Sequence, residues 1–141
     1  GWAKPVPYNP YNLKNQRSGT FIVAIAGVFT NFLIALFFGL LVRFSGELGI
    51  GSQAFLEIAS MVIFVNVLLG VFNLIPIPPL DGSKVLFSLL SPTLYYIEEF
   101  LSRYSIILLI LLIFFLWRLV LPVVYFLFAL FSGVSLGILN I

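Results

Sequence analysis

The sequence predicts an all-α, polytopic integral membrane protein with about four apolar segments, one of them a proline-broken helix that carries Asp81. Two observations lead to this prediction. Of the 141 residues, 62% are hydrophobic and 9% are charged, which is more apolar surface than a soluble domain of this length buries. The apolar residues also gather in runs long enough to cross a hydrocarbon core of about 30 Å. We therefore expect residues 1–141 to form a single membrane domain.

The charged and reactive residues exclude several classes of protein. Seven Lys and Arg against five Asp and Glu give a net charge of +2, and no basic run alternates with aromatic residues, so no nucleic-acid partner is expected. Cysteine is absent, which excludes disulfides, thiolate metal sites and a cysteine nucleophile. Histidine is absent too, which limits the metal sites that the chain can build.

The first two membrane spans follow from the apolar pattern. Residues 1–19 are rich in Pro, Asn and Tyr, and each proline disfavours helix at the residue before it, so we expect an interfacial loop. Residues 21–42 form an uncharged run whose clearly polar members are Thr30 and Asn31, and we predict a transmembrane helix there. After a Gly-rich loop, residues 54–74 form the second predicted transmembrane helix.

The second half of the chain is predicted to contain a break and one or two further spans. Residues 75–103 begin with PIPPLDG, which ends the preceding helix, and finish with an amphipathic segment suited to the membrane surface. The apolar stretch 105–141 is too long for one ordinary span, and Arg118 with Pro122 divides it. It crosses either twice as a hairpin or once as a tilted helix with a kinked tail.

The positions of the cations predict the orientation. If the first two spans cross the membrane, most cations lie on one side, and Arg43 and Arg118 lie on the other. By the positive-inside rule, residues 1–19 and 80–103 are therefore expected on the cytoplasmic side. The cations of that side are Lys4, Lys14, Arg17, Lys84 and Arg103.

Asp81 is the most informative single residue. A carboxylate near the bilayer centre costs roughly 2.5 to 3.5 kcal/mol, so an acid at membrane depth is expected to have a function. Pro76, Pro78 and Pro79 impose non-helical backbone just before it, and such backbone is tolerated in a membrane only where it lines a cavity or is buried in protein. We therefore expect water or a ligand to reach Asp81.

Three interpretations of Asp81 follow from the residues alone. As a helix cap, its carboxylate would accept backbone N–H groups at the start of a helix beginning at Gly82. As an interfacial residue, it would pair with Lys84. As a metal ligand presented by a broken helix, it would bind a hard or borderline cation, while Asn73 directs its amide towards whatever binds nearby.

The motif around Asp81 resembles a known family. FNLIPIPPLDGSKVL, residues 72–86, is similar to the Asn-x-x-Pro-x-Pro-x-Leu-Asp-Gly signature of the site-2 protease family, the intramembrane zinc metalloproteases. GWAKPVPYNPYNLKN and the Ala26-Gly27 pair followed by Asn31 also resemble the bacterial members, which have a compact core of roughly six spans. The resemblance implies that residues 1 to about 120 correspond to the second half of that core, in a bacterial-type inner or plasma membrane.

Carried onto this sequence, the resemblance implies a role for each residue of the motif. Asp81 would be the third zinc ligand, and Asn73 would hold the substrate or stabilise the oxyanion near the metal. Zinc-activated water would cleave transmembrane protein substrates within the bilayer. The residues that would shape the loop carrying the ligand are Pro76, Pro78, Pro79 and Gly82.

Other polar residues have more ordinary expected roles. The resemblance implies that the segment from Lys4 to Asn15 is a membrane-associated loop that contacts substrate or gates its entry. For Gly27 and Asn31 we favour helix packing, in which a small residue admits a close neighbour and an amide bonds to another helix. Asn66 is expected to be a packing or hydrogen-bonding residue, and the acids and Arg103 of the amphipathic segment are expected to form a solvated face.

The chain departs from the family pattern in one respect. The family's H-E-x-x-H helix, which carries two histidine ligands and the glutamate base, would precede Gly1. Because no histidine is present, we expect the 141 residues alone neither to retain zinc nor to hydrolyse peptides. We expect the chain to be the C-terminal part of a protease, and its missing partners are the N-terminal H-E-x-x-H helices. The other explanation is that the chain is a relic that acts as a binding protein.

Two further classes of function compete with a protease. A fragment of a transporter or ion-binding membrane protein would also place an acid in a broken helix, but it predicts an inverted repeat that these residues do not contain. A catalytically dead membrane scaffold would capture single-span partners through Gly27, Asn31 and Asn73. It predicts stable capture of these partners without any requirement for metal.

Overall fold

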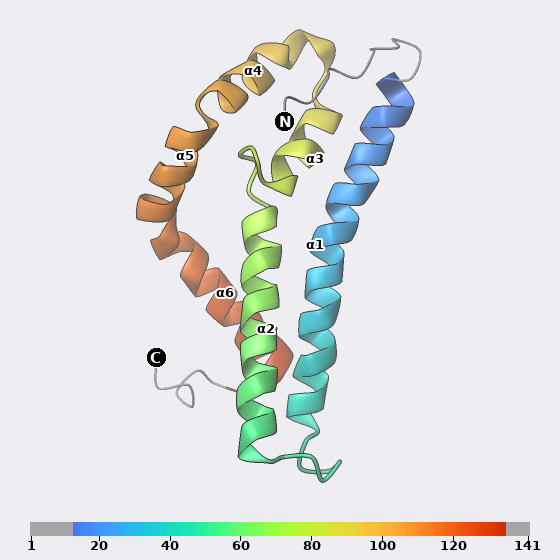
Figure 1. Cartoon of the computed structure of the whole chain (residues 1–141), viewed down its shortest axis with the longest axis vertical. Coiled ribbons are helices and arrows are strands. Elements are labelled where there is room, and N and C mark those ends of the chain that lie inside the picture. Colours follow the sequence, from blue (N-terminus) through green and yellow to red (C-terminus); the bar gives the residue numbers. More distant parts are fainter. Residues whose placement is uncertain (1–12, 135–141) are drawn as a thin grey trace, which may run out of the picture.

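The computed structural model describes residues 13–134, and every regular element in this range is a helix (Figure 1). Two long helices, α1 (Leu13–Arg43) and α2 (Gln53–Asn73), pack side by side and are joined by a loop. Three short elements lie at the far end of this pair: α3 (Asp81–Leu89), a 3₁₀ turn (Pro92–Leu94) and α4 (Tyr95–Arg103). Of these, α3 packs against α1, and the first residue of α3, Asp81, lies beside Gly27 of α1.

The last two helices bring the chain back along the bundle. A π-helical segment, Leu112–Leu116, joins α5 (Ser105–Leu111) to α6 (Trp117–Ser132), and the chain bends by 66° between them. Helix α6 packs against both α1 and α2, whereas α5 leans away from them (Figure 1). The division predicted at Arg118 and Pro122 is corrected by this finding. The bend lies earlier, because the widened turns of the π-helical segment kink the chain, and Pro122 stays inside α6.

Two of the described helices are long and apolar enough to cross a membrane, Gln16–Arg43 and Gln53–Asn73. The bent pair Ser105–Phe115 and Trp117–Ser132 makes a third span if it crosses as one unit. The predicted class, an all-helical membrane protein, is confirmed. Among the described residues two or three candidate spans are found, so the predicted count of about four apolar segments is not confirmed. Residues 135–141 of the predicted last segment lie outside the described range.

The start of α1 differs from the predicted one. The helix begins at Leu13, inside the region predicted as an interfacial loop, so the predicted loop is corrected for residues 13–19. The physical reason is that no proline follows Pro10 in this region, while Gln16 and Arg17 are good helix formers. Residues 1–12, which include most of the predicted membrane-associated loop from Lys4, lie outside the described range.

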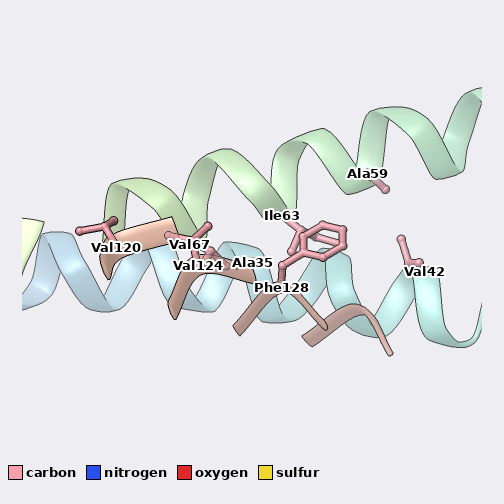
Figure 2. Packing of buried hydrophobic residues seen from close by; sticks show 8 residues of the cluster. All are labelled: Ala35, Val42, Ala59, Ile63, Val67, Val120, Val124 and Phe128. Carbon is pink, nitrogen blue, oxygen red and sulfur yellow. The ribbon is translucent and has the colours of Figure 1, made fainter. Parts of the chain in front are cut away.

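The core lies where α6 crosses the pair of α1 and α2 (Figure 2). Close packing, rather than a hydrophobic effect, holds helices together in lipid, so small residues at the contacts are favoured. A Cβ atom added to Gly39 of α1 would lie 2.6 Å from the carbonyl oxygen of Phe131, so α6 approaches α1 closely at this point. The buried side chains of the cluster are Ala35, Val42, Ala59, Ile63, Val67, Val120, Val124 and Phe128.

Arg43 ties the end of α1 to the end of α6. Its guanidinium donates a hydrogen bond of 3.1 Å to the backbone carbonyl of Leu130, in the last turn of α6. Gly133 follows that helix with a φ of 69°, the left-handed conformation that commonly ends a helix. A cation at this end offsets the negative pole of the helix dipole and satisfies a carbonyl that has no partner within the helix.

Replacing Arg43 with Met is therefore expected to lower the free energy of unfolding by about 1 kcal/mol. Thermal unfolding of the protein in detergent measures this change. Arg118→Met is the matched control, because Arg118 is an exposed cation of α6. An equal loss in both variants would show that the positive charge matters and the hydrogen bond to Leu130 does not.

Candidate functional site

The proline-rich linker between α2 and α3 is the centre of the candidate site. Helix α2 ends at Asn73, and the backbone of the linker then turns instead of continuing as a helix. Its N–H groups bond locally, from Ile75 to the carbonyl of Phe72 (3.0 Å) and from Leu80 to the carbonyl of Ile77 (2.9 Å). Because these turns satisfy backbone groups that a helix would otherwise pair, the broken helix is compatible with a membrane-embedded position.

Gly82 brings the first turn of α3 directly onto this linker. The residue is buried, and a Cβ atom added to it would collide with the carbonyl oxygen of Leu74 and lie 2.5 Å from that of Ile75. These are backbone atoms, so no side-chain rotation relieves the contact. The Asp-Gly pair is therefore held against the end of α2 by the lack of a side chain at the second residue.

Asp81 is the first residue of α3, and its carboxylate faces two partners. Oδ1 accepts a hydrogen bond from Nζ of Lys84 at 2.7 Å. Oδ2 points towards α1, where a Cβ atom added to Gly27 would lie 3.6 Å from it. The side chain is 29% exposed. One oxygen is thus paired within α3, and the other lies over a glycine of the neighbouring helix.

These contacts distinguish two of the interpretations of Asp81. Helix α3 begins at Asp81 rather than Gly82, and the capping position belongs to Leu80, which has no side-chain cap bond. Within residues 13–134, no backbone N–H donates to the Asp81 carboxylate, so the helix-cap interpretation is corrected. The reason is that Asp81 already has helical backbone, whereas a cap stands one residue outside the helix. The ion pair with Lys84 is present.

Gly27 is thus the residue of α1 that the fold brings to Asp81. At 3.6 Å an added Cβ atom would make an ordinary contact with the carboxylate, so this approach does not itself require glycine, and the packing role expected for Gly27 stays a prediction. Asn31 lies one turn further along the same face of α1, since residues four apart share a face. It is half-buried, and among the described residues no hydrogen bond joins its side chain to Asp81.

The remaining predicted residues lie apart from this contact. Asn73 is half-buried in the last turn of α2, and within the described range its amide makes no side-chain hydrogen bond. Pro76 and Pro79 are exposed on the linker, and Pro78 is half-buried. The side-chain amide of Asn66 donates a hydrogen bond of 2.8 Å to the backbone carbonyl of Val62 in the same helix.

The amphipathic segment is helix α4, as the sequence pattern predicts. Arg103 pairs with Glu99 at 2.8 Å, and both side chains are about two-thirds exposed, so they form a solvated face. Sequence reasoning missed a contact between this helix and the start of α1: Arg17 donates a hydrogen bond of 2.5 Å to the hydroxyl of Tyr95. The two residues are 78 positions apart, so no local pattern links them.

The residues present do not fit a complete zinc centre. Catalytic zinc needs three protein ligands, commonly histidines with a carboxylate. The chain contains no histidine and no cysteine, and between residues 13 and 134 no three Asp or Glu side chains gather in a group that could hold a metal ion. Asp81 can contribute one ligand, and no other residue at this site can complete the set.

These features define a polytopic helical membrane protein in which a proline-broken helix presents one carboxylate to a neighbouring span. Residues 48–115 match the model of a protein family described as Peptidase family M50. The matched region runs from the loop before α2 into the π-helical segment and includes Asp81. Over this region the chain is similar to that family, which is the family of the site-2 proteases, as the motif at Asn73–Gly82 predicts.

Two curated relatives support the assignment. The protein named "Putative zinc metalloprotease YwhC" of Bacillus subtilis (strain 168) is 36% identical over 97 residues, which cover 65% of this chain and 44% of that protein. A protein of Streptococcus pyogenes serotype M1, also named as a zinc metalloprotease of putative status, is 29% identical over 75 residues, which cover 53% of this chain and 18% of that protein. The matches thus span less than half the length of either relative. No solved structure matches the chain significantly.

Proposed function

We propose that the protein is a zinc metalloprotease of the site-2 type that cleaves membrane-protein substrates, and that Asp81 supplies one ligand of its zinc. The observation that carries this proposal is the position of the Asp81 carboxylate. The linker turns out of α2, Gly82 packs on that linker, and the Oδ2 atom of Asp81 is directed across to α1 at Gly27. A carboxylate held in this way at the edge of a broken helix can bind a metal that other helices share.

The other ligands must come from residues outside these 141, because the chain has no histidine. The relatives' greater length leaves room for such residues. By this proposal two histidines and a glutamate base complete the site in the complete protein, and the 141-residue chain alone has no peptidase activity. Lys84 would balance the Asp81 charge when no metal is bound.

Asn73 is proposed to orient the substrate backbone. It ends α2, seven linker residues before Asp81, and its amide makes no side-chain hydrogen bond within the described residues. An amide both donates and accepts, so it matches the N–H and C=O groups of an unwound peptide segment. The end of the bundle with α3 and α4 would face the cytoplasm, as the distribution of cations predicts.

Metal removal tests this proposal in the complete protein, reconstituted in liposomes with a single-span membrane substrate. We expect o-phenanthroline to remove bound zinc and to stop peptide-bond cleavage, and added zinc to restore both, because a catalytic zinc is held by few ligands in an open site. The m-phenanthroline isomer, which does not chelate, is the matched control and should leave cleavage unchanged. Cleavage by protein that is shown to be metal-free would refute the zinc mechanism.

A further inference from the structure

A groove at one end of the bundle adjoins the candidate site at Lys84. It has a volume of about 710 Å³ and opens between the start of α1, helix α3 and helix α4. Its walls carry both signs of charge together with hydroxyl groups, so it is unlike a lipid-facing apolar surface. The residues on which the argument rests are Arg17, Lys84, Ser88, Tyr95, Glu98 and Glu99.

The residues around the groove are those expected at the depth of lipid headgroups. The stretch of α1 that can span a membrane begins at Gln16, so Arg17 lies in the first turn of that span. Helix α4 carries exposed Tyr96 and Phe100, and the exposed Tyr104 follows its last residue. Aromatic residues of this kind gather at the membrane-water interface. A ligand that enters this groove therefore comes from the interface rather than from bulk water or the bilayer centre.

Arg17 is the cation in the groove that is oriented for an anion. Its guanidinium donates to the Tyr95 hydroxyl at 2.5 Å and to the Leu90 carbonyl at 3.3 Å, which fixes the plane of the group. A guanidinium has five N–H donors, so further donors remain for a phosphate. Lys84, by contrast, is committed to Asp81 at 2.7 Å.

A second, apolar cavity adjoins the groove at Arg17. It has a volume of about 380 Å³, and Arg17 and Ser88 line both cavities. Its other walls include Phe21, Ile22 and Leu89. Phe21 and Ile22 lie one turn beyond Arg17 along α1, towards the middle of the span, and Ile22 and Leu89 are mostly exposed. A polar groove thus continues into an apolar one at the boundary between headgroups and hydrocarbon.

We propose that these two cavities together bind one phospholipid with a zwitterionic headgroup that ends in a primary amine. The phosphate lies on Arg17, the ammonium faces Glu98 of α4, and one acyl chain follows Phe21, Ile22 and Leu89. Glu99 also lines the groove but is paired with Arg103. The acids disfavour a purely anionic headgroup, and a primary ammonium can donate hydrogen bonds to a carboxylate, which a trimethylammonium group cannot. The inference does not depend on the proposed proteolysis.

Native mass spectrometry of the complete protein tests the proposal. The protein is incubated with an equimolar mixture of phosphatidylethanolamine, phosphatidylglycerol and phosphatidylcholine with the same acyl chains. We expect phosphatidylethanolamine to be retained preferentially, and Arg17→Gln to reduce its retention about tenfold, the effect of losing a charged hydrogen bond. Arg118→Gln removes the same charge from an exposed position on α6 and should leave retention unchanged.

Glu98→Gln keeps the proposal testable if Arg17→Gln does not fold, because it leaves the Arg17–Tyr95 bond in place. It should preserve lipid binding but shift the preference towards phosphatidylglycerol. Equal retention of the three lipids by the unaltered protein, or no change of preference in Glu98→Gln, would overturn the headgroup assignment. If soluble phosphoethanolamine competes as well as the lipid does, the apolar cavity contributes nothing and the acyl-chain assignment is wrong.

Discussion

Asp81→Asn is expected to abolish peptide-bond cleavage in the complete protein, with a loss on the order of 10²-fold or more, while the protein still inserts and folds. Asparagine has nearly the same shape as aspartate but lacks the negative charge that makes a carboxylate a good zinc ligand. The expected effect on stability is small. The Asp81 side chain is 29% exposed and the Lys84 side chain 49% exposed, and an ion pair this accessible is worth about 0 to 1 kcal/mol.

Cleavage of a membrane substrate and zinc content are measured together for this variant. Glu47→Gln is the matched control, because it removes an exposed carboxylate from the loop between α1 and α2 and leaves Asp81 untouched. Lys84→Met tests the competing role, in which Asp81 only balances a cation. If that role were the whole explanation, Lys84→Met would be as harmful as Asp81→Asn. Full cleavage and full zinc content in Asp81→Asn would remove this residue from the metal site.

The apolar helices could be predicted closely from sequence. Residues 54–74 were expected to span the membrane, and α2 runs from Gln53 to Asn73. The prediction was close because a long apolar run between a Gly-rich loop and a Pro-rich linker has well-marked ends. The amphipathic helix α4 was predictable for a similar reason, since its charged residues repeat with the period of a helix. Both signals are local, so the rest of the fold does not override them.

The contacts that build the candidate site could not be predicted in the same way. Gly27 meets Asp81 across 54 positions of sequence, and Arg17 meets Tyr95 across 78, and neither contact leaves a periodic pattern. The family resemblance singled out both Asp81 and Gly27 but did not place them in contact, and it did not point to Arg17 or Tyr95. The bend at the π-helical segment was missed because nothing but apolar residues marks it, whereas Pro122 gave a stronger but misleading local signal.

Gly82→Ala is expected to destabilise the protein by about 1 to 3 kcal/mol, although intrinsic helix propensity favours alanine. Gly82 lies in the first turn of α3, where a new methyl group would collide with the backbone carbonyl groups of Leu74 and Ile75. The N–H of Leu74 bonds to the carbonyls of Gly70 and Val71, so the linker is anchored to the end of α2 and cannot easily retreat. The strain would therefore move α3 and, with it, the carboxylate of Asp81.

Gly19→Ala is the matched control, because its expected effect on stability has the opposite sign to that of Gly82→Ala. A Cβ atom added to Gly19 of α1 would have no heavy atom within 4 Å, so alanine there should be neutral or should stabilise by roughly 0.5 to 1 kcal/mol. Thermal unfolding in detergent and cleavage by the complete protein are compared for both variants. If Gly82→Ala stabilises as Gly19→Ala does, the linker has room for a side chain. The close contact would then not be what positions Asp81, and the placement of its carboxylate would depend on the contact of α3 with α1 alone.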